Sequence, residues 1–341
     1  MKRLVVSSVA LALAASTAVA EPKEGRGKPR EGDLATFTNM DARDAETRLK
    51  ILQHETYELA QKVIALQFAQ SYGDTIRMKF DYFASGAELI PAYVFTPKDM
   101  PAGQRRPAVV LLHGGFHERF NVEWFPLIDE LVRGGYVVIF PEYRGSRGYG
   151  EELYANDYGR TDTADVLAAA DYIATKDFVD PQRLAVVGES RGGMLTLLAI
   201  EQAPKKFKAA VDIVGLTDFV AYMAYKPEYR RQEVARENKG FNGQLPDKNL
   251  AAYMAVSPIN HVDKIETPVL VLATTGDTIA PLTLHTGRLL DALKARNKVH
   301  EAKIYDNAPG GHTFLHGDTP ERQDAYARIL RWLDTYLKAA R

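Results

Sequence analysis

The chain of 341 residues contains no cysteine. This absence excludes disulfide bonds, a thiol nucleophile, a thiolate zinc site and a cysteine-ligated iron–sulfur cluster. The sequence also lacks an excess of one charge, because its 43 Lys and Arg nearly balance its 44 Asp and Glu and the formal net charge is -1. Nucleic-acid-binding proteins need a basic field, so the balance argues against a nucleic-acid partner. With 46% hydrophobic and 26% charged residues, the sequence is able to form a full-sized core.

Residues 1–20 have the layout of a secretory signal peptide. Residues 1–3 bring two positive charges, residues 4–19 are mostly apolar and uncharged, and Ala18-Val19-Ala20 fits a small-x-small cleavage site. We therefore expect cleavage after Ala20, a secreted or periplasmic mature protein, and no stable membrane insertion after cleavage. The alternative is an uncleaved membrane anchor, for which the apolar stretch is short and rich in Ala and Ser.

Two patterns precede the main domain, which we expect over residues 75–341, and a third opens it. Residues 21–41 are predicted as a flexible leader, because their first part is charged and rich in Gly and Pro. Residues 42–70 are predicted as a helical arm with apolar side chains on one face, namely Leu52, Leu59, Val63 and Leu66. Residues 76–82 alternate between apolar and polar, and a return strand over 89–96 would complete an antiparallel pair.

After Pro107, short apolar runs alternate with helical patterns. The runs cover 108–112, 136–140, 184–187, 209–214 and 269–273, and the helical patterns lie near 122–134, 162–177, 190–203, 283–296 and 320–339. Continuous apolar runs of this length are typical of parallel strands buried on both faces. The alternation predicts a doubly wound α/β domain. Residues 217–257, rich in Tyr and charge, interrupt it and are predicted as a cap-like helical insertion above the sheet.

The segment Gly188-Glu189-Ser190-Arg191-Gly192 follows the apolar run 184–187 and opens a helical pattern. G-x-S-x-G between a strand and a helix is typical of a nucleophile elbow, a strained turn that lifts the serine hydroxyl off the carboxyl edge of a sheet. The start of the following helix favours developing negative charge. An ordinary glycine-rich turn with a capping serine is the alternative. We interpret Ser190 as the nucleophile.

A serine hydroxyl needs a base, and the base needs an acid that orients it. Asp277 comes shortly after the apolar run 269–273, and His312 follows a glycine pair behind a further predicted strand. Both are expected at the same sheet edge as Ser190, in the chain order nucleophile, acid, histidine that suits such an elbow. Other candidates remain open, namely Asp212 and Asp218 for the acid and His316 for the base.

The segment His113-Gly114-Gly115-Phe116-His117 follows the first apolar run of the main domain. Glycines let backbone N–H groups approach a substrate oxygen. We expect one oxyanion donor here, at Gly115 or Phe116, and the other at the backbone N–H of Arg191. The two histidines lie four residues apart without an H-E-x-x-H pattern, so no metal site and no cofactor are expected.

The substrate pocket is expected under the insertion. Candidate substrate contacts are Phe116, Tyr143, Phe219 and Tyr222, with Tyr225 and Tyr253 as further candidate walls. For the four aromatics of the insertion, Phe219, Tyr222, Tyr225 and Tyr253, the alternative is packing within the insertion's own core. The Arg191 side chain would either attract a substrate carboxylate or, as we favour, pair with Glu142 or Glu189.

Several stretches together resemble the catalytic domain of the prolyl oligopeptidase family of serine peptidases. They are His113-Gly114-Gly115-Phe116-His117, Tyr143-Arg144-Gly145-Ser146-Arg147-Gly148-Tyr149-Gly150, Asp180-Pro181-Gln182-Arg183 and Ser257-Pro258-Ile259-Asn260. The likeness covers about residues 76–340. It implies an α/β-hydrolase fold, with a doubly wound, mostly parallel sheet, helices on both faces and N-terminal antiparallel strands. It also implies the triad Ser190, Asp277 and His312, with the N–H groups of Gly115 and Arg191 as oxyanion donors.

The sequence also departs from this family. Arg191 stands where the family typically has Tyr, Phe116 replaces Pro, and we expect the large β-propeller that filters peptides to be absent. We therefore expect a secreted serine hydrolase that cleaves peptide or carboxylic ester bonds of small substrates. A carboxylesterase without peptidase activity and a non-catalytic secreted binding protein are the alternatives. The oligomeric state is left open.

Overall fold

The computed structural model describes residues 45–101 and 103–338. The predicted signal peptide (1–20), the leader (21–41) and the first residues of the arm lie outside the described residues. The chain divides into two units at residue 57, and helix α2 (Ala45–Tyr72) begins before this division and ends after it. Within the described residues, no helix is both long and apolar enough to cross a membrane. All further elements belong to the second unit.

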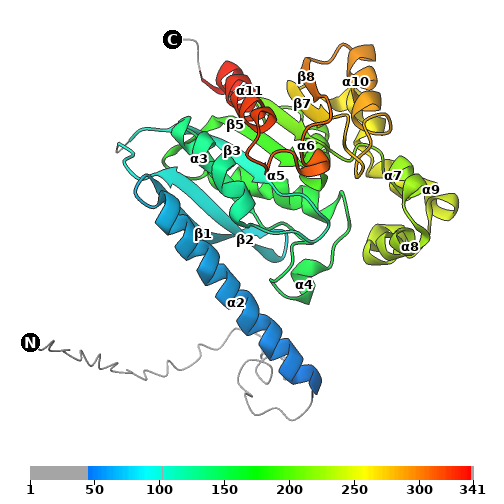
Figure 1. Cartoon of the computed structure of the whole chain (residues 1–341), viewed down its shortest axis with the longest axis horizontal. Coiled ribbons are helices and arrows are strands. Elements are labelled where there is room, and N and C mark those ends of the chain that lie inside the picture. The colour runs from blue at the N-terminus through cyan, green and yellow to red at the C-terminus, as the bar shows by residue number, and fades with distance from the viewer. Residues whose placement is uncertain (1–44, 102, 339–341) are drawn as a thin grey trace, which may run out of the picture. The chain divides into compact units, whose positions relative to one another are not determined.

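An eight-stranded sheet forms the centre of the second unit (Figure 1). Its strands are β1 (Ile76–Ser85), β2 (Glu88–Pro97), β3 (Arg106–Leu112), β4 (Val137–Pro141), β5 (Val179–Glu189), β6 (Ala209–Ile213), β7 (Val269–Thr274) and β8 (His300–Tyr305). The spatial order is β1-β2-β4-β3-β5-β6-β7-β8. β2 pairs antiparallel with β1 and β4, whereas all other neighbours pair parallel. The predicted mostly parallel sheet with N-terminal antiparallel strands is confirmed.

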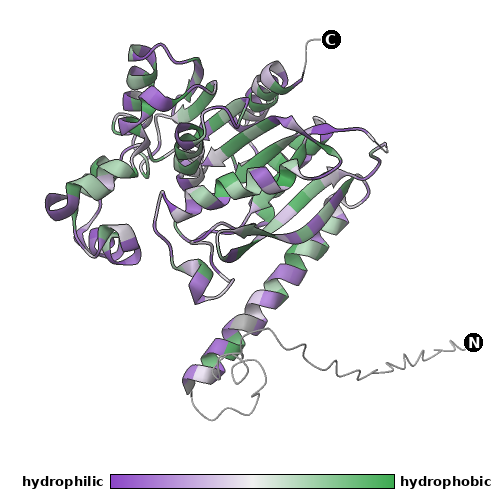
Figure 2. Cartoon of the chain, turned by 180° about the vertical axis from the view of Figure 1, so that it is seen from behind, coloured by the Kyte–Doolittle hydropathy of each residue, from purple (hydrophilic) through white to green (hydrophobic). Residues whose placement is uncertain are grey.

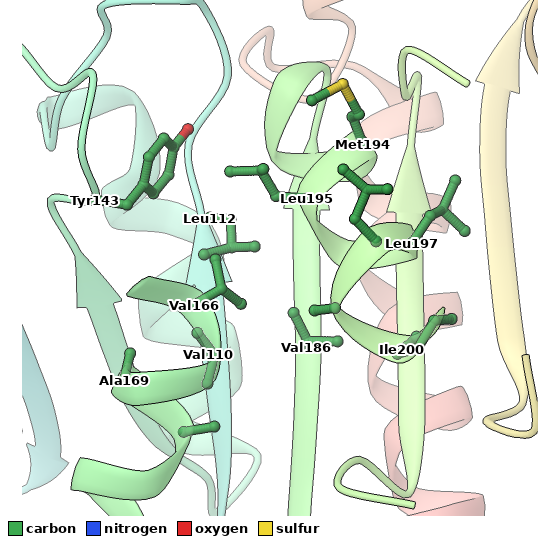
Figure 3. Packing of buried hydrophobic residues seen from close by; sticks show 14 of the residues in the cluster. Val110, Leu112, Tyr143, Val166, Ala169, Val186, Met194, Leu195, Leu197 and Ile200 are labelled. Carbon is green, nitrogen blue, oxygen red and sulfur yellow. The ribbon is translucent and has the colours of Figure 1, made fainter. Parts of the chain in front are cut away.

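Helices cover both faces of the sheet, because the central strands are apolar on both sides (Figure 2). The helices are α3 (Phe125–Arg133), α4 (Glu151–Tyr154), α5 (Thr161–Ala174), α6 (Arg191–Gln202), α10 (Thr286–Ala295) and α11 (Pro320–Leu337). Side chains of α5, α6 and α10 form one core cluster with the sheet, and those of α3 and α11 form another. Figure 3 shows the first cluster, where α5 and α6 lie beside Val110, Leu112 and Val186.

The helical arm buries a different stripe from the predicted one. Ile64 and Phe68 are buried, and the Phe68 ring packs 5.1 Å from that of Phe95. Leu59 and Leu66, on the predicted face, are 62% and 70% exposed. Since a large ring buries more apolar surface than a leucine, the stripe that carries Phe68 faces the sheet.

The predicted insertion contains three helices between β6 and β7. They are α7 (Phe219–Tyr225), α8 (Glu228–Glu237) and α9 (Pro246–Ala255). Its core includes the stacked rings of Phe241 and Tyr253, whose centroids lie 3.7 Å apart. The Tyr253 hydroxyl donates to the Gln244 carbonyl oxygen at 2.7 Å. Tyr253 therefore packs the insertion itself, which was the alternative given for each of its aromatic residues.

Candidate active site

Ser190 lies on the turn between β5 and α6, at the carboxyl end of the sheet. Its backbone has φ 57° and ψ -116°, a region that side chains rarely adopt. The turn is tight, because a Cβ on Gly192 would lie only 2.4 Å from the carbonyl oxygen of Leu112. The backbone at the start of α6 therefore packs closely on the end of β3. This approach requires glycine and leaves the Ser190 hydroxyl at the sheet edge.

A continuous chain of hydrogen bonds begins at Ser190. Its Oγ lies 2.7 Å from Nε2 of His312, and Nδ1 of the same ring lies 2.7 Å from Oδ2 of Asp277. The other oxygen of Asp277 accepts from the backbone N–H groups of Ile279 and Ala280, each at 2.8 Å. Both carboxylate oxygens are occupied, so the acid is fixed and orients the ring. The structure thus brings together the three residues predicted as nucleophile, base and acid.

The rival acids and the rival base have other partners or positions. Asp218 caps α7 through the backbone N–H of Ala221 and forms an ion pair with Arg288. Asp212 is fully buried in β6, and burial raises the pKa of its carboxyl to about 7. Nε2 of His316 lies 2.8 Å from a carboxylate oxygen of Glu189, whereas the Ser190 hydroxyl is bonded to His312.

The loop after β3 lies against the nucleophile, since a Cβ on Gly114 would lie 3.1 Å from Cβ of Ser190. His113 braces this loop. Its Nε2 bonds the Ser146 hydroxyl at 2.9 Å, and the Tyr143 hydroxyl donates to its carbonyl oxygen at 2.7 Å. Burial lowers the pKa of His113 to about 3, so the ring stays neutral.

The Arg191 side chain corrects two expectations. It does not face the substrate, because the guanidinium is 0% exposed, and its partner is neither Glu142 nor Glu189. Instead it forms an ion pair with Asp162, at the start of α5. A charge buried so deeply needs a buried partner of opposite sign, and Asp162 is likewise 0% exposed.

The same guanidinium holds the loop that carries the predicted oxyanion donors. It donates to the carbonyl oxygen of Phe116, and to that of Arg144 at 3.3 Å. Gly115, one residue before Phe116, has φ 63°, and a Cβ there would lie 2.3 Å from Cγ of Glu118. The backbone of this loop is therefore fixed from two sides, by a glycine turn and by Arg191.

A cavity of about 510 Å³ opens at Ser190. Of the predicted substrate contacts, Phe116 and Tyr222 line it. Tyr143 and Phe219 do not, because both are fully buried behind its wall. Tyr143 stacks on His113 with centroids 4.3 Å apart, and Phe219 packs against Phe116 and Tyr222 from behind. Tyr143 is thus a support of the loop rather than a pocket residue.

Sequence reasoning did not assign several charged groups to the cavity. Lys226 and Arg230 line it from the insertion, but Pro227 separates the helix of Tyr222 from the helix of Arg230, so no single helical pattern marked them in the sequence. Glu189 and His316 form an ion pair on another side. Burial alone would lower the pKa of His316, but the hydrogen bond and charge of Glu189 outweigh it and raise the pKa to about 9.

Residues 45–101 and 103–338 contain no group of three or more His, Asp or Glu side chains arranged to hold a metal ion. The Nδ1 of His117 bonds the Gly145 carbonyl oxygen at 2.7 Å, and its Nε2 lies 3.5 Å from a carboxylate oxygen of Glu237. His113 and His117 therefore both serve to fix loops.

Proteins with similar sequences include acylamino-acid-releasing enzymes. The acylamino-acid-releasing enzyme of Arabidopsis thaliana is 29% identical over 259 residues, which cover 72% of this chain and 32% of that protein. Acylamino-acid-releasing enzyme 1 of Oryza sativa subsp. japonica is 33% identical over 210 residues, or 57% of this chain and 26% of that protein. The chain thus spans about a third or less of the length of these relatives.

Solved structures share the fold. An acylaminoacyl peptidase in complex with Z-Gly-Gly-Phe-chloromethyl ketone matches with a TM-score of 0.67 at 22% identity, over 78% of this chain and 43% of that one. A puromycin-hydrolyzing peptidase of Mycobacterium tuberculosis matches with a TM-score of 0.64 at 27% identity, over 77% and 39%. These likenesses confirm the α/β-hydrolase fold. The profile of the prolyl oligopeptidase family matches residues 124–340, well over half of the chain, so this protein belongs to that family and is a serine hydrolase.

Proposed function

We propose that this protein is a peptidase that cleaves acyl bonds of small peptide substrates through an acyl-enzyme on Ser190. The observation that carries the proposal is the chain of two 2.7 Å hydrogen bonds from Asp277 through His312 to Ser190. Ser190, at the end of these hydrogen bonds, lines an open cavity of about 510 Å³, which is large enough for a small acyl group and its leaving group. The family and the peptidase relatives support peptide substrates.

The proposed reaction has two steps. His312 takes the hydroxyl proton of Ser190 as its Oγ attacks the substrate carbonyl carbon, and the oxyanion accepts hydrogen bonds from backbone N–H groups of the 113–117 loop and of Arg191. His312 then gives the proton to the leaving amine. In the second step His312 takes a proton from water as the water attacks the acyl carbon, and it returns that proton to Oγ of Ser190. Asp277 holds the ring tautomer and stabilises the imidazolium. One oxyanion donor contributes on the order of 3 kcal/mol to transition-state stabilisation.

Carboxylic esters are proposed as a second substrate class. Acylation needs only a carbonyl carbon at Oγ and its oxygen in the oxyanion hole, and an alcohol leaves more readily than an amine. Matched p-nitrophenyl esters and aminoacyl or peptidyl p-nitroanilides, compared by kcat/KM, measure the preference between the two classes. Ester turnover without any anilide turnover would identify a carboxylesterase and contradict the peptidase proposal.

A fluorophosphonate probe tests the nucleophile directly, because it reacts with activated serines. The parent protein should label, and Ser190→Ala should neither label nor turn over the substrates above the background rate. Ser71→Ala is a matched control, since Ser71 is an exposed serine on α2. A Ser190→Ala variant that labels and hydrolyses like the parent would refute the role of Ser190.

We also propose that the protein is exported and that its mature form begins at Glu21. The supporting pattern is the positive start, the uncharged apolar stretch and the small residues at positions 18 and 20. Intact mass and N-terminal sequencing of protein from the culture medium and cell fractions would test this. Full-length protein that keeps Met1 and stays in the cytosolic fraction would contradict it.

A further inference from the structure

The insertion brings two cations to the cavity that contains Ser190. Lys226 directly follows α7, and Arg230 lies in the first turn of α8. Both line the cavity together with Phe116 and Tyr222. The Lys226 Nζ lies 4.7 Å from the centroid of the Tyr222 ring, and the Arg230 Cζ lies 5.0 Å from that of Phe116. One wall of the cavity thus carries two positive charges, each lying over the face of an aromatic ring.

Lys226 has no carboxylate partner in the described part of the chain, and its Nζ donates to the carbonyl oxygen of Ile279 at 3.3 Å. It also lies over the rings of Tyr222 and Tyr225. Burial, and then the neighbouring Arg230, lower the pKa of Lys226, which marks an environment that disfavours its charge. An anion bound beside it would relieve this cost.

Arg230 is only partly neutralised. One of its nitrogens pairs with Glu233 on the same helix, and Glu233 is the more exposed member of that pair. A planar guanidinium has five N–H donors in a fork, so one such pair leaves donors for a second carboxylate. Lys226, by contrast, offers a compact point charge. Together the two groups have the chemistry of a carboxylate subsite.

The acidic residues of the cavity come from other elements. Glu118 and Glu123 lie on the stretch between β3 and α3, and Glu189 immediately precedes the nucleophile. Glu189 is paired with His316, and Glu118 lies 3.4 Å from Arg147. Glu189 and Glu118 thus have cationic partners, whereas Glu123 forms no ion pair within the described residues; none of the three lies on the insertion, so the insertion wall is the part of the cavity suited to an anion.

The direction of the reaction decides which part of the substrate meets this wall. The leaving group takes its proton from His312, so it departs along the side of the cavity that carries His312 and His316. The acyl oxygen is held by the loop that contains Phe116. The loop side and the His312 side are thus taken by the carbonyl oxygen and the leaving group, which leaves the insertion wall with Tyr222, Lys226 and Arg230 for the acyl chain.

We propose that Lys226 and Arg230 form a subsite for a carboxylate at the far end of the acyl group, so that the enzyme prefers acidic acyl groups. Suitable substrates are half-esters or half-amides of short dicarboxylic acids and derivatives of acidic amino acids. This inference rests on the proposed function, because it requires an acyl-enzyme on Ser190. The aliphatic part of the acyl group would pass beside Phe116 and Tyr222, which line the same cavity.

The test compares two p-nitrophenyl esters of equal chain length, the pentanoate and the glutarate half-ester. Spontaneous hydrolysis is measured with Ser190→Ala and subtracted. We expect kcat/KM for the glutarate half-ester to exceed that for the pentanoate by about tenfold, since a charge-assisted contact contributes on the order of that factor. Added salt should reduce this preference, because it screens the charges. A preference that is absent or reversed in the parent overturns the proposal.

Variants assign the preference to the insertion. Lys226→Gln should remove part of this preference and reduce the ratio of the two kcat/KM values about threefold, because Arg230 remains. Lys226→Glu should reverse the preference in favour of a p-nitrophenyl ester whose acyl group ends in an ammonium. Lys248→Gln is the matched control and should keep the parent ratio, because Lys248 lies on the same insertion with a 75% exposed side chain. Thermal unfolding verifies that each variant is folded. A folded Lys226→Glu variant with the parent ratio would overturn the assignment.

The outcomes separate this inference from the proposed function. If neither ester is hydrolysed above the Ser190→Ala rate and the fluorophosphonate probe does not label the parent, the proposed function fails. If the pentanoate is hydrolysed and the probe labels Ser190 but the glutarate half-ester has no advantage, only the carboxylate subsite fails.

Discussion

Replacement of Arg191 by Met separates two roles of its side chain. The guanidinium is 0% exposed, neutralises Asp162 and donates to the carbonyl oxygen of Phe116. Methionine keeps much of the apolar length but removes the charge and the donors. The variant leaves the Asp162 carboxylate buried, with the Asn156 amide at 3.1 Å and the backbone N–H of Thr163 at 2.8 Å as its remaining partners.

Removal of one partner of a buried ion pair costs about 3–5 kcal/mol. A domain of this kind has a total stability of about 5–15 kcal/mol, so Arg191→Met should lose about a fifth of it or more. Neutralisation of the acid in the double variant Arg191→Met with Asp162→Asn should restore a large part of that loss. The Phe116 carbonyl stays without its donor in both variants, so the oxyanion loop should remain misplaced and kcat should stay about 10- to 100-fold below the parent.

Urea unfolding of the two single variants and the double variant measures the stability terms. Steady-state kinetics on one p-nitrophenyl ester, separated into kcat and KM, measures the loop effect. If Arg191→Met does not fold, the double variant still provides both measurements. A double variant that regains the parent kcat along with its stability would refute the claim that Arg191 positions the loop, and an Arg191→Met variant that unfolds at the parent urea concentration would refute the energetic argument.

Three further changes have defined outcomes. Gly192→Ala puts a Cβ 2.4 Å from the Leu112 carbonyl oxygen, so it should separate β3 from α6 and abolish most ester turnover, while an unchanged kcat/KM would contradict the packing argument. Asp277→Asn should lower kcat by about 10⁴-fold by favouring the wrong tautomer of the base, and a loss below tenfold in stopped-flow or steady-state assays would contradict that role. The ion pair with Glu189 raises the pKa of His316 to about 9, so protonated His316 stabilises the fold fully below pH 6.5 and this stabilisation is lost as pH rises through 9. In urea unfolding across this window, the free energy of unfolding of the parent should fall by on the order of 2–3 kcal/mol more than that of His316→Gln. Parallel stability curves for the two proteins would refute the ion pair with Glu189.

The sheet was predictable because its signal is local. Strands buried on both faces require continuous apolar runs, and each predicted run of the main domain lies at a strand of the sheet. The order of Ser190, Asp277 and His312 follows from the same logic, since the carboxyl ends of parallel strands meet at one edge. These features need no knowledge of which distant elements touch.

The remaining features depend on tertiary packing. Arg191 pairs with Asp162, 29 residues earlier, because α5 and α6 lie on the same face of the sheet, and no local pattern marks that pair. Tyr143 follows β4 and turns inward to His113, whereas a sequence motif specifies no direction for a side chain. The prediction of the buried face of α2 was wrong because the helix has two apolar stripes, and only the packing of Phe68 decides which of them is buried.

The backbone at Ser190 has an evolutionary consequence. Its φ and ψ are free of strain only for glycine, and a side chain there costs on the order of 1–3 kcal/mol. Selection for hydrolysis is what retains the side chain. In a lineage that no longer needs the reaction, serine to glycine at this position would raise stability, whereas most substitutions lower it. Descendants that keep the fold for binding alone are therefore expected to acquire glycine at position 190 early, before Asp277 and His312 are replaced.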